Sequence, residues 1–364
     1  MKVAIVHFAL LYMSGAEKVL EALCELYPEA DIFTHVYDPS KVSDRINKHR
    51  VKTTFIQKLP GAHKHYKSYL PLMPYALEQL DLSGYDLIIS GESGPTKGVV
   101  PPPDSLHVCY CHSPMRYVWD MNHEYTARKS ALLKPFYAYF IHKLKIWDYT
   151  TAGRVDLFIA NSSFVQKRIK KYYRREALVL SPPVDADEFE IAERTGDFYL
   201  WLGRFVDYKR ADLAIHAFNK LKKKFVMIGS SEASSSFREM AGDNIEILGF
   251  QPFQEIKAKL SQCKALIFPG IEDAGIVPIE AMASGRPVIA YNKGGLKDTV
   301  KEGLTGIFFD EQTPESLEEA VLRFEEQEDM FDPSAIKAHA AAYNKESFKN
   351  RFKEIVEGAL TSGE

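Results

Sequence analysis

The chain has 364 residues, more than one ordinary hydrophobic core needs, and suits two domains of about 150–200 residues each. Its 46% hydrophobic and 26% charged residues are typical of globular proteins and exclude a disordered or fibrous chain. The net charge of −3 is unevenly distributed, because residues 1–180 hold 24 Lys and Arg against 17 Asp and Glu. The basic first half suits an anionic partner.

The first residues superficially resemble a signal peptide, with a Lys, an apolar run and small residues. We interpret residues 3–6 as a buried first strand instead, because His7 interrupts the run and a helical pattern follows from residue 16. No apolar run approaches the ~18–20 residues that span a bilayer. We therefore expect no membrane span, no export and a cytoplasmic location.

The four cysteines suit a reducing compartment. Cys109 and Cys111 lie two apart in a predicted strand, and we expect them to point to opposite faces and not to bind a metal together. We expect all four cysteines to serve core packing, and no metal site.

Short apolar strands alternate with helical patterns along the whole chain. In the first half we predict strands at 3–8, 31–37, 86–91, 107–112 and 156–162, with helices at 16–27 and 163–173. In the second half we predict strands at 198–204, 224–230, 245–250, 265–270, 286–291 and 306–309, and helices at 210–223, 253–263, 278–284, 296–303 and 314–327. In these strands apolar residues do not alternate with polar ones. Such strands between helices indicate an α/β protein whose parallel sheets are covered on both faces.

Pro182 and Pro183 interrupt this alternation, and consecutive prolines exclude a helix. We therefore predict a Rossmann-like N-terminal domain over 1–180, a second Rossmann-like domain over 181–345, and a final helix within 346–364. In open parallel sheets ligands bind beyond the carboxyl ends of the strands, so the loops directly after strands are the candidate sites.

Two such loops lie in the first half. Gly15 permits a close backbone approach at a helix start, whose amides suit a phosphate; the alternative is an ordinary β–α turn. His112, Arg116 and Tyr117 cluster where another strand ends. A lone histidine more often has a structural role, but this one lies beside a cation at a strand end.

A third loop, GRFVDYKR (203–210), follows the strand that begins the second half. Arg204 offers a planar fork for phosphate oxygens, and Lys209 adds a point charge five residues later. The pair suits a diphosphate, although a solvated basic loop has the same composition.

The fourth loop opens the stretch IEDAGIVPIEAMASGRPVIAYNKGG (271–295). Pro278 fits the first position of a helix and Glu280 lies near its third, so a helix cap is one role for Glu280. Glu272 lies before the turn, and the amides of residues 274–277 lie between the two glutamates. Hydroxyls need acceptors and phosphates need donors, so this arrangement suits a polyol attached to a phosphate.

The Glu-X7-Glu spacing of Glu272 and Glu280 within this stretch resembles the signature of retaining GT-B glycosyltransferases of family four. GRFVDYKR resembles the phosphate-binding loop of that family, and SGAE (14–17) resembles its N-terminal glycine loop. Order and spacing agree over nearly the whole chain. More narrowly, LPLMPYALEQLDLSGYDLIIS (70–90) and HVCYCHSPMRYVWD (107–120) resemble bacterial and archaeal mannosyltransferases of polysaccharide and O-antigen assembly.

The resemblance implies two Rossmann-like domains that face each other across a cleft, with the C-terminal helix packed back on the N-terminal acceptor domain. It implies transfer of a hexose, with retention of anomeric configuration, from a sugar nucleotide bound by the C-terminal donor domain, with no cofactor and no metal. The narrower likeness implies GDP-mannose as the donor and a glycan or lipid-linked acceptor in cell-surface polysaccharide synthesis. A UDP-sugar such as UDP-glucose is the alternative donor.

The resemblance also gives each site residue a role. As catalytic residues, His112 contacts the hexose near its 6-hydroxyl and Glu272 holds its 3-hydroxyl. Glu280 accepts hydrogen bonds from the ribose hydroxyls. The other donor-binding residues are Gly15, Arg204, Lys209, Ala274, Gly275, Ile276 and Val277. The acceptor or sugar pocket includes Arg116 and Tyr117, and the base pocket includes Gly229 and Phe250. Ala274 and Ser14 depart from the family, which usually has an aromatic or Ser at the first position and Gly at the second.

Residues 48–75 and 128–148 interleave basic with aromatic residues. Such a surface suits an anionic membrane or a lipid-linked pyrophosphate acceptor, and the alternative is a solvated basic face above core aromatics. Our hypothesis is peripheral contact of the N-terminal domain with the inner face of the plasma membrane. No nucleic-acid-binding motif accompanies the charge, so we expect no nucleic acid partner.

Three other functions compete with this interpretation. A sugar-nucleotide epimerase needs acid and base residues that flank C2, and we identify no such set. A dehydrogenase needs a Gly-X-Gly-X-X-Gly after a strand, and SGAEKV lacks it. A non-catalytic sugar-nucleotide-binding protein needs neither His112 nor Glu272, and the presence of both favours an enzyme.

Overall fold

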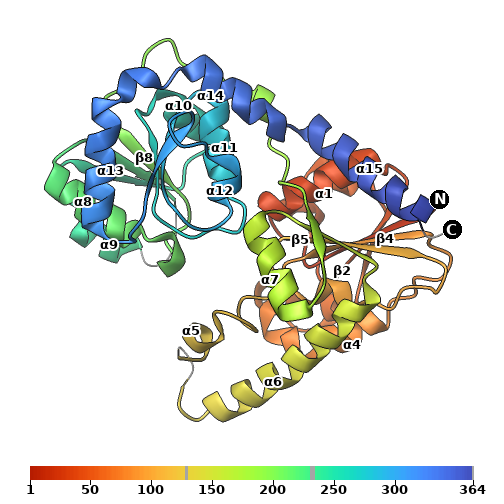
Figure 1. The fold of residues 1–364 in the computed structure, drawn as a ribbon. Coiled ribbons are helices and arrows are strands. Elements are labelled where there is room, and N and C mark those ends of the chain that lie inside the picture. Colours follow the sequence, from red (N-terminus) through yellow and green to blue (C-terminus); the bar gives the residue numbers. More distant parts are fainter. Residues whose placement is uncertain (128–129, 230–233, 363–364) are drawn as a thin grey trace. The chain divides into compact units, whose positions relative to one another are not determined.

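The computed structural model describes residues 1–127, 130–229 and 234–362. The chain folds into two compact units, one of Met1–Pro182 with Phe348–Glu364 and the other of Pro183–Ser347. Each unit is built on one parallel β-sheet with helices packed against it (Figure 1), a Rossmann-like α/β architecture. The acceptor and donor roles assigned to the two domains stay predictions.

The first unit contains the strands β1 (Val3–His7), β2 (Asp31–Thr34), β3 (Val51–Thr53), β4 (Leu87–Glu92), β5 (Leu106–Cys111), β6 (Leu157–Ala160) and β7 (Ala177–Val179). They form one sheet in the order β3-β2-β1-β4-β5-β6-β7. The strands predicted in this half are confirmed, but the edge strands β3 and β7 were not predicted. Each has only 3 residues, of which two are polar in β3 and two are exposed in β7, so neither forms a buried apolar strand.

The helices of this unit are α1 (Gly15–Leu26), α2 (Asp44–Asn47), α3 (Ala62–His65), α4 (Met73–Glu78), α5 (Asn122–Ala127), α6 (Lys134–Thr151) and α7 (Ser163–Tyr173). Those predicted at 16–27 and 163–173 are confirmed as α1 and α7. The sequence did not predict α6, whose aromatic and basic residues were interpreted only as a surface segment. Residues 128–129 of that segment lie outside the described residues.

The second unit contains the strands β8 (Tyr199–Leu202), β9 (Phe225–Ile228), β10 (Ile245–Gly249), β11 (Leu266–Phe268), β12 (Val288–Tyr291) and β13 (Gly306–Phe309). They form a parallel sheet in the order β10-β9-β8-β11-β12-β13, which confirms the strands predicted here. Ser230, the last residue of one predicted strand, lies outside the described residues.

The helices of the second unit are α8 (Ala211–Leu221), α9 (Ser234–Met240), α10 (Phe253–Gln262), α11 (Ile276–Ala283), α12 (Leu296–Thr299), α13 (Pro314–Glu326) and α14 (Pro333–Ala340). α12 is shorter than the predicted 296–303. It ends early because Val300 is extended and Gly303 has a left-handed φ of 75°.

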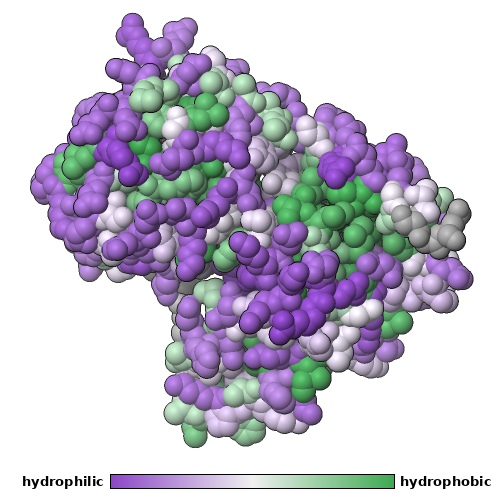
Figure 2. All heavy atoms as spheres, viewed as in Figure 1, coloured by the Kyte–Doolittle hydropathy of each residue, from purple (hydrophilic) through white to green (hydrophobic). Residues whose placement is uncertain are grey.

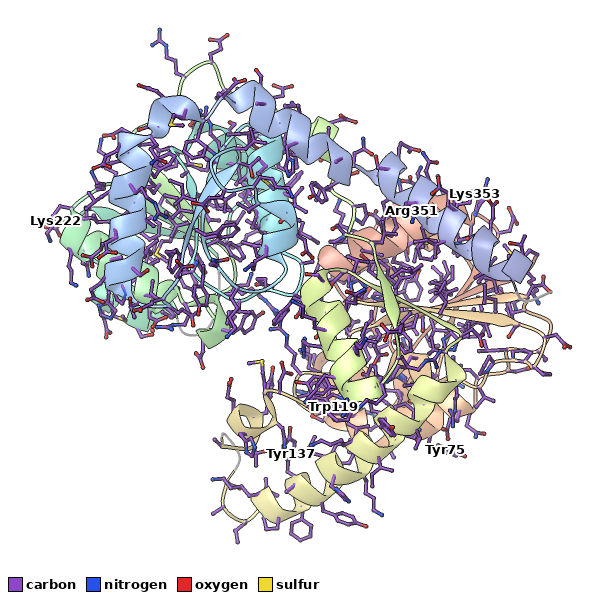
Figure 3. All side chains as sticks on the ribbon, in the orientation of Figure 1. Tyr75, Trp119, Tyr137, Lys222, Arg351 and Lys353 are labelled. Carbon is purple, nitrogen blue, oxygen red and sulfur yellow. The ribbon has the colours of Figure 1, made fainter. Side chains whose placement is uncertain are left out.

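The C-terminal helix α15 (Lys345–Ser362) packs on the first unit, as predicted. Its apolar face joins the core beneath α1 through Phe348, Phe352, Ile355 and Val356. Lys349 adds an ion pair of 3.0 Å with Glu25 of α1. Arg351 and Lys353, labelled in Figure 3, lie on the exposed side of α15.

The expectation that Cys109 and Cys111 point to opposite faces is wrong. Residues two apart on a strand point to the same face, and both side chains lie in one buried cluster with Phe158 and Val165. All four cysteines are free and buried, which agrees with core packing.

Across the described ranges, no group of three or more His, Cys, Asp or Glu side chains is placed to hold a metal ion. No helix within those ranges is long and apolar enough to cross a membrane.

A buried ion network lies at the carboxyl end of β4. The ammonium group of Lys97, 0% exposed, lies 3.3 Å from Glu92 Oε1 and contacts Asp148 Oδ1 of α6. Asp148 Oδ2 accepts hydrogen bonds from the Trp119 indole at 2.7 Å and the Tyr173 hydroxyl at 3.0 Å. Burial alone lowers the pKa of Lys97, but Asp148 and Glu92 outweigh it and raise that pKa above its usual value. The network therefore ties α6, α7 and the loop after β5 to β4.

Replacing Lys97 by Met tests this network. The substitution removes the ammonium group but leaves Glu92 and Asp148 buried, so we expect the free energy of unfolding to fall by about 3–5 kcal/mol. Urea unfolding of the full chain measures the change. Lys170→Met on α7 is the matched control, because Lys170 and its partner Glu176 are exposed and such pairs contribute little. Equal stability of the two variants would contradict the account.

Candidate functional site

His112 follows β5 at the carboxyl edge of the first sheet. Its amide donates to the Glu92 carbonyl at 2.9 Å, and its carbonyl accepts from Asn161 Nδ2 at 2.9 Å. The imidazole packs edge to face on Tyr110 with 5.0 Å between centroids, and Tyr110 contacts Phe348 of α15 at 5.7 Å. The position of the predicted catalytic histidine is therefore set by a buried aromatic pair that includes the C-terminal helix.

Arg168 of α7 holds the rest of the loop after β5. Its guanidinium donates to Ser113 Oγ at 2.8 Å and to the Pro114 carbonyl at 3.3 Å. It also bonds Asp120 Oδ1 at 2.7 Å. Trp119, labelled in Figure 3, anchors the same loop to the ion network. The loop that begins at His112 is thus fixed at both ends.

Arg116 and Tyr117, predicted for the acceptor or sugar pocket, lie in this loop. The Tyr117 hydroxyl donates to Met115 Sδ at 2.9 Å, and its ring meets Tyr125 edge to face. Burial raises the pKa of Tyr117 well above its usual value, so the phenol stays neutral. Arg116 is partly exposed. A contact of either side chain with a substrate stays a prediction.

The predicted glycine loop begins α1 and is held by a buried pair that the sequence did not single out. Gly15 is the first residue of α1, and Glu17 Oε2 accepts from the amide of Ser14 at 2.9 Å and from its hydroxyl. Glu17 Oε1 lies 3.0 Å from His7 Nε2, and the two residues are only 3% and 4% exposed. Burial acts to raise the pKa of Glu17, but His7 and Ser14 outweigh it and lower that pKa below its usual value. The signal for this pair in the sequence is His7, a polar residue at the end of the first apolar strand.

In the second unit the structure brings two predicted site residues together. Lys209 Nζ lies 2.9 Å from Glu272 Oε1, and both side chains are largely buried. Arg204 is exposed, and no ion pair or hydrogen bond of its side chain is found among the described residues. The cation predicted for the diphosphate and the carboxylate predicted for the hexose therefore form one ion pair, with Arg204 on the same loop.

Two glycines make room for Lys209. A Cβ atom at Gly203 would lie 3.1 Å from Lys209 Nζ, and one at Gly270 would lie 2.8 Å from Lys209 Cα. The second distance is shorter than real side chains tolerate, and its neighbour is backbone. The end of β11 can therefore approach the Lys209 loop only because Gly270 lacks a side chain, whereas a Cβ atom at Gly203 would displace only the end of the Lys209 side chain.

The helix that follows Glu272 begins earlier than predicted. Gly275, with a left-handed φ of 78°, caps α11, so Ile276 and Val277 are its first residues and their amides have no acceptor within the helix. Pro278 is the third residue and Glu280 the fifth, not the first and third. Glu280 thus lies beyond the first turn, where a carboxylate gains less from the helix dipole. Buried Ala274 completes the turn.

The residues predicted for the base pocket lie at the carboxyl ends of β9 and β10. The amide of Gly229 donates to the Gly249 carbonyl at 2.9 Å, which joins the two strand ends. Phe250 follows directly, and 78% of its surface is exposed. An exposed ring beside a strand end offers a face for stacking, and its contact with a base stays a prediction.

Both halves of the chain match models of glycosyltransferase families. Residues 13–188 match the family described as Glycosyltransferase Family 4, and residues 185–348 match Glycosyl transferases group 1. The two matches overlap over residues 185–188, just after the prolines that separate the two sheets.

Two curated relatives and two solved structures are similar to this chain. An uncharacterized glycosyltransferase of Methanocaldococcus jannaschii is 29% identical over 182 residues, which cover 48% of this chain and 51% of that protein. The alpha-1,3/1,6-mannosyltransferase ALG2 of Dictyostelium discoideum is 27% identical over 259 residues, covering 54% and 56%. The chain thus spans about half the length of these relatives.

The solved structures match over the whole chain at low identity, so they show the fold alone. Sucrose-phosphate synthase from Thermosynechococcus elongatus has a TM-score of 0.76 at 16% identity and covers 99% of this chain and 100% of its own. Anabaena HepE in complex with UDP has a TM-score of 0.73 at 15% identity, covering 98% and 100%. Residues 13–188 thus match a Glycosyltransferase Family 4 domain and residues 185–348 a glycosyl transferases group 1 domain. The fold of the chain is that of the GT-B structures.

Proposed function

We propose that the chain is a retaining glycosyltransferase, which moves a hexose from a sugar nucleotide to a glycan or lipid-linked acceptor. The ion pair of Lys209 with Glu272, in the loop that leads into α11, is the observation that carries the proposal. It joins a cation suited to phosphate, a carboxylate suited to sugar hydroxyls and helix amides suited to anions. The two family matches support the same activity.

The proposed reaction begins when the donor diphosphate binds at Arg204, Lys209 and the amides of α11. The diphosphate competes for Lys209, which frees Glu272 to accept a hydroxyl of the hexose. Cleavage of the bond between hexose C1 and phosphate leaves positive charge on the sugar ring, and the same cations stabilise the departing diphosphate. The leaving phosphate takes the proton of the acceptor hydroxyl, whose oxygen bonds C1 from the same face. No carboxylate nucleophile is required, in contrast to retaining hydrolases.

GDP-mannose is our proposed donor. The likeness of residues 70–90 and 107–120 to mannosyltransferases supports mannose, and so does the relative named as a mannosyltransferase. UDP-glucose is the second candidate, because a protein with the same fold is solved in complex with UDP. In either case Glu280 holds the ribose, and Gly229 with Phe250 contacts the base.

Measurements of binding and turnover distinguish an enzyme from a non-catalytic sugar-nucleotide-binding protein. We expect GDP-mannose to raise the melting temperature of the chain, since ligand at 100 times its Kd stabilises by about 2.7 kcal/mol. His112→Ala and Glu272→Ala each lower the release of GDP from GDP-mannose by about 100-fold or more, yet bind GDP nearly as well as the original chain. Glu319→Ala, at an exposed position on α13, is the control with full turnover. Stabilisation by UDP-glucose but not by GDP-mannose would contradict the proposed donor.

We also propose that the first unit contacts an anionic membrane through α6. Large apolar side chains project from its outer face, including Leu132 just before the helix, Phe136 and Tyr139, of which Leu132 is 85% exposed. The stretch 125–147 holds five Lys and Arg and no Asp or Glu. At the bottom of Figure 2, where Figure 1 draws α6, hydrophobic and hydrophilic residues mix at the surface. Apolar side chains among cations suit an interface with anionic lipid.

The second basic segment lies beside α6. Leu70 of residues 48–75 packs in the cluster of Met115, Val118 and Leu144, and Leu144 belongs to α6. Tyr75 of α4, labelled in Figure 3, is exposed as well. The two segments that the sequence singled out therefore pack against each other in the first unit.

Flotation with liposomes tests this surface. We expect the full chain to bind vesicles of phosphatidylcholine with phosphatidylglycerol better than vesicles of phosphatidylcholine alone. Phe136→Ser combined with Tyr139→Ser weakens binding roughly tenfold or more, because apolar area no longer enters the interface. Leu322→Ser, which changes an exposed apolar residue of α13, is the control with unchanged binding. Equal binding to both vesicle types would refute the proposal.

A further inference from the structure

The register of the first sheet places three residues on one face at the ends of neighbouring strands. The pairing of β1 with β4 sets His7 beside Gly91, and Gly91 pairs with Tyr110 of β5. His112, two residues beyond Tyr110, points to the same face. His7, Gly91 and His112 thus share the face that α1 covers.

Gly91 leaves a space between the two imidazole rings. A Cβ atom at Gly91 would lie 3.5 Å from His7 Nδ1, 3.8 Å from His112 Nε2 and 3.9 Å from the carbonyl oxygen of Val6. One nitrogen of each ring therefore lies within 4 Å of the same position in front of β4. A hydroxyl group that enters this spot meets polar atoms on both sides, and it can donate one hydrogen bond and accept another.

Glu17 fixes the proton of His7. Glu17 is ionised in its bonds to Ser14 and His7, so Nε2 of His7, 3.0 Å from Oε1, carries the proton. In the neutral ring Nδ1 then has a lone pair. No hydrogen bond to this nitrogen is found in the part of the chain that the structure describes. The acceptor atom of a buried, carboxylate-oriented histidine thus lies beside Gly91.

We propose that His7 contacts a hydroxyl group of the donor hexose through Nδ1, with Glu17 as its positioning residue. The inference rests on the proposed function, which assigns His112 to the hexose, and it adds a second histidine on the other side of Gly91. The space that Gly91 leaves receives the hydroxyl. A nucleoside diphosphate without the sugar makes no such contact, so the hexose alone depends on this pair of rings.

Gly91→Ala tests the space directly. The distances from its new methyl group to the two rings are ordinary van der Waals contacts, so the fold is retained, but the methyl group occupies the spot of the hydroxyl. We expect GDP-mannose to bind about tenfold or more weakly by calorimetry, with the affinity for GDP unchanged. Gly153→Ala is the matched control, because a Cβ atom there meets nothing within 4 Å.

His7→Gln tests the acceptor atom. The glutamine amide still offers a donor to Glu17, so the buried carboxylate keeps a partner, but the ring nitrogen at Nδ1 is lost. We expect the same selective loss of GDP-mannose affinity, again with GDP binding unchanged. UDP-glucose and UDP are measured in parallel, as the second donor and its sugar-free counterpart.

The outcomes separate the inference from the function on which it rests. If the original chain binds a sugar nucleotide and both variants bind it equally well, the inference is wrong and the proposed function stands. If the variants lose the nucleoside diphosphate as much as the sugar nucleotide, His7 and Gly91 are structural only and the inference is overturned. If the original chain binds neither GDP-mannose nor UDP-glucose, the proposed function fails, and the inference with it.

Discussion

All strands of both sheets run parallel, so every loop that follows a strand lies along one edge of its sheet. In the first unit this edge holds His7, His112 and the start of α1. In the second it holds Lys209, Glu272 and the start of α11, and the two side chains meet at 2.9 Å although they follow different strands. Parallel pairing thus gathers the polar residues, and the glycines at strand ends let their backbones approach.

Charges buried near these edges have partners that offset the cost of leaving water. Lys97 lies between two carboxylates, and Glu17 is bonded by His7 and Ser14. Each group connects a strand end to a helix or loop that carries a predicted site residue. In the proposed reaction this arrangement keeps polar groups in place before the substrate arrives, which is the condition for electrostatic stabilisation of the departing diphosphate.

Much of the fold could be predicted because short apolar runs between helical patterns mark buried parallel strands. Edge strand β3 has two polar residues among its three and β7 has two exposed ones, so neither is a buried apolar run. Helix α6 has exposed aromatic residues where an amphipathic helix has polar ones. The pairing of His7 with Glu17 depends on the capping geometry of α1, and that of Lys209 with Glu272 depends on the space at Gly270. Neither the capping geometry nor the space can be predicted from the residue types alone. Cys109 and Cys111 share one face because side chains alternate along a strand with a period of two.

The central claim is transfer of a hexose from a sugar nucleotide with retention. Proton NMR of the anomeric signal tests it most directly, when the chain is incubated with GDP-mannose and, separately, with UDP-glucose while water serves as the acceptor. The account predicts that the first hexose released has the anomeric configuration of the donor, before mutarotation mixes the two forms. Release of the opposite anomer first would contradict retention, and no consumption of either donor would contradict the proposed activity.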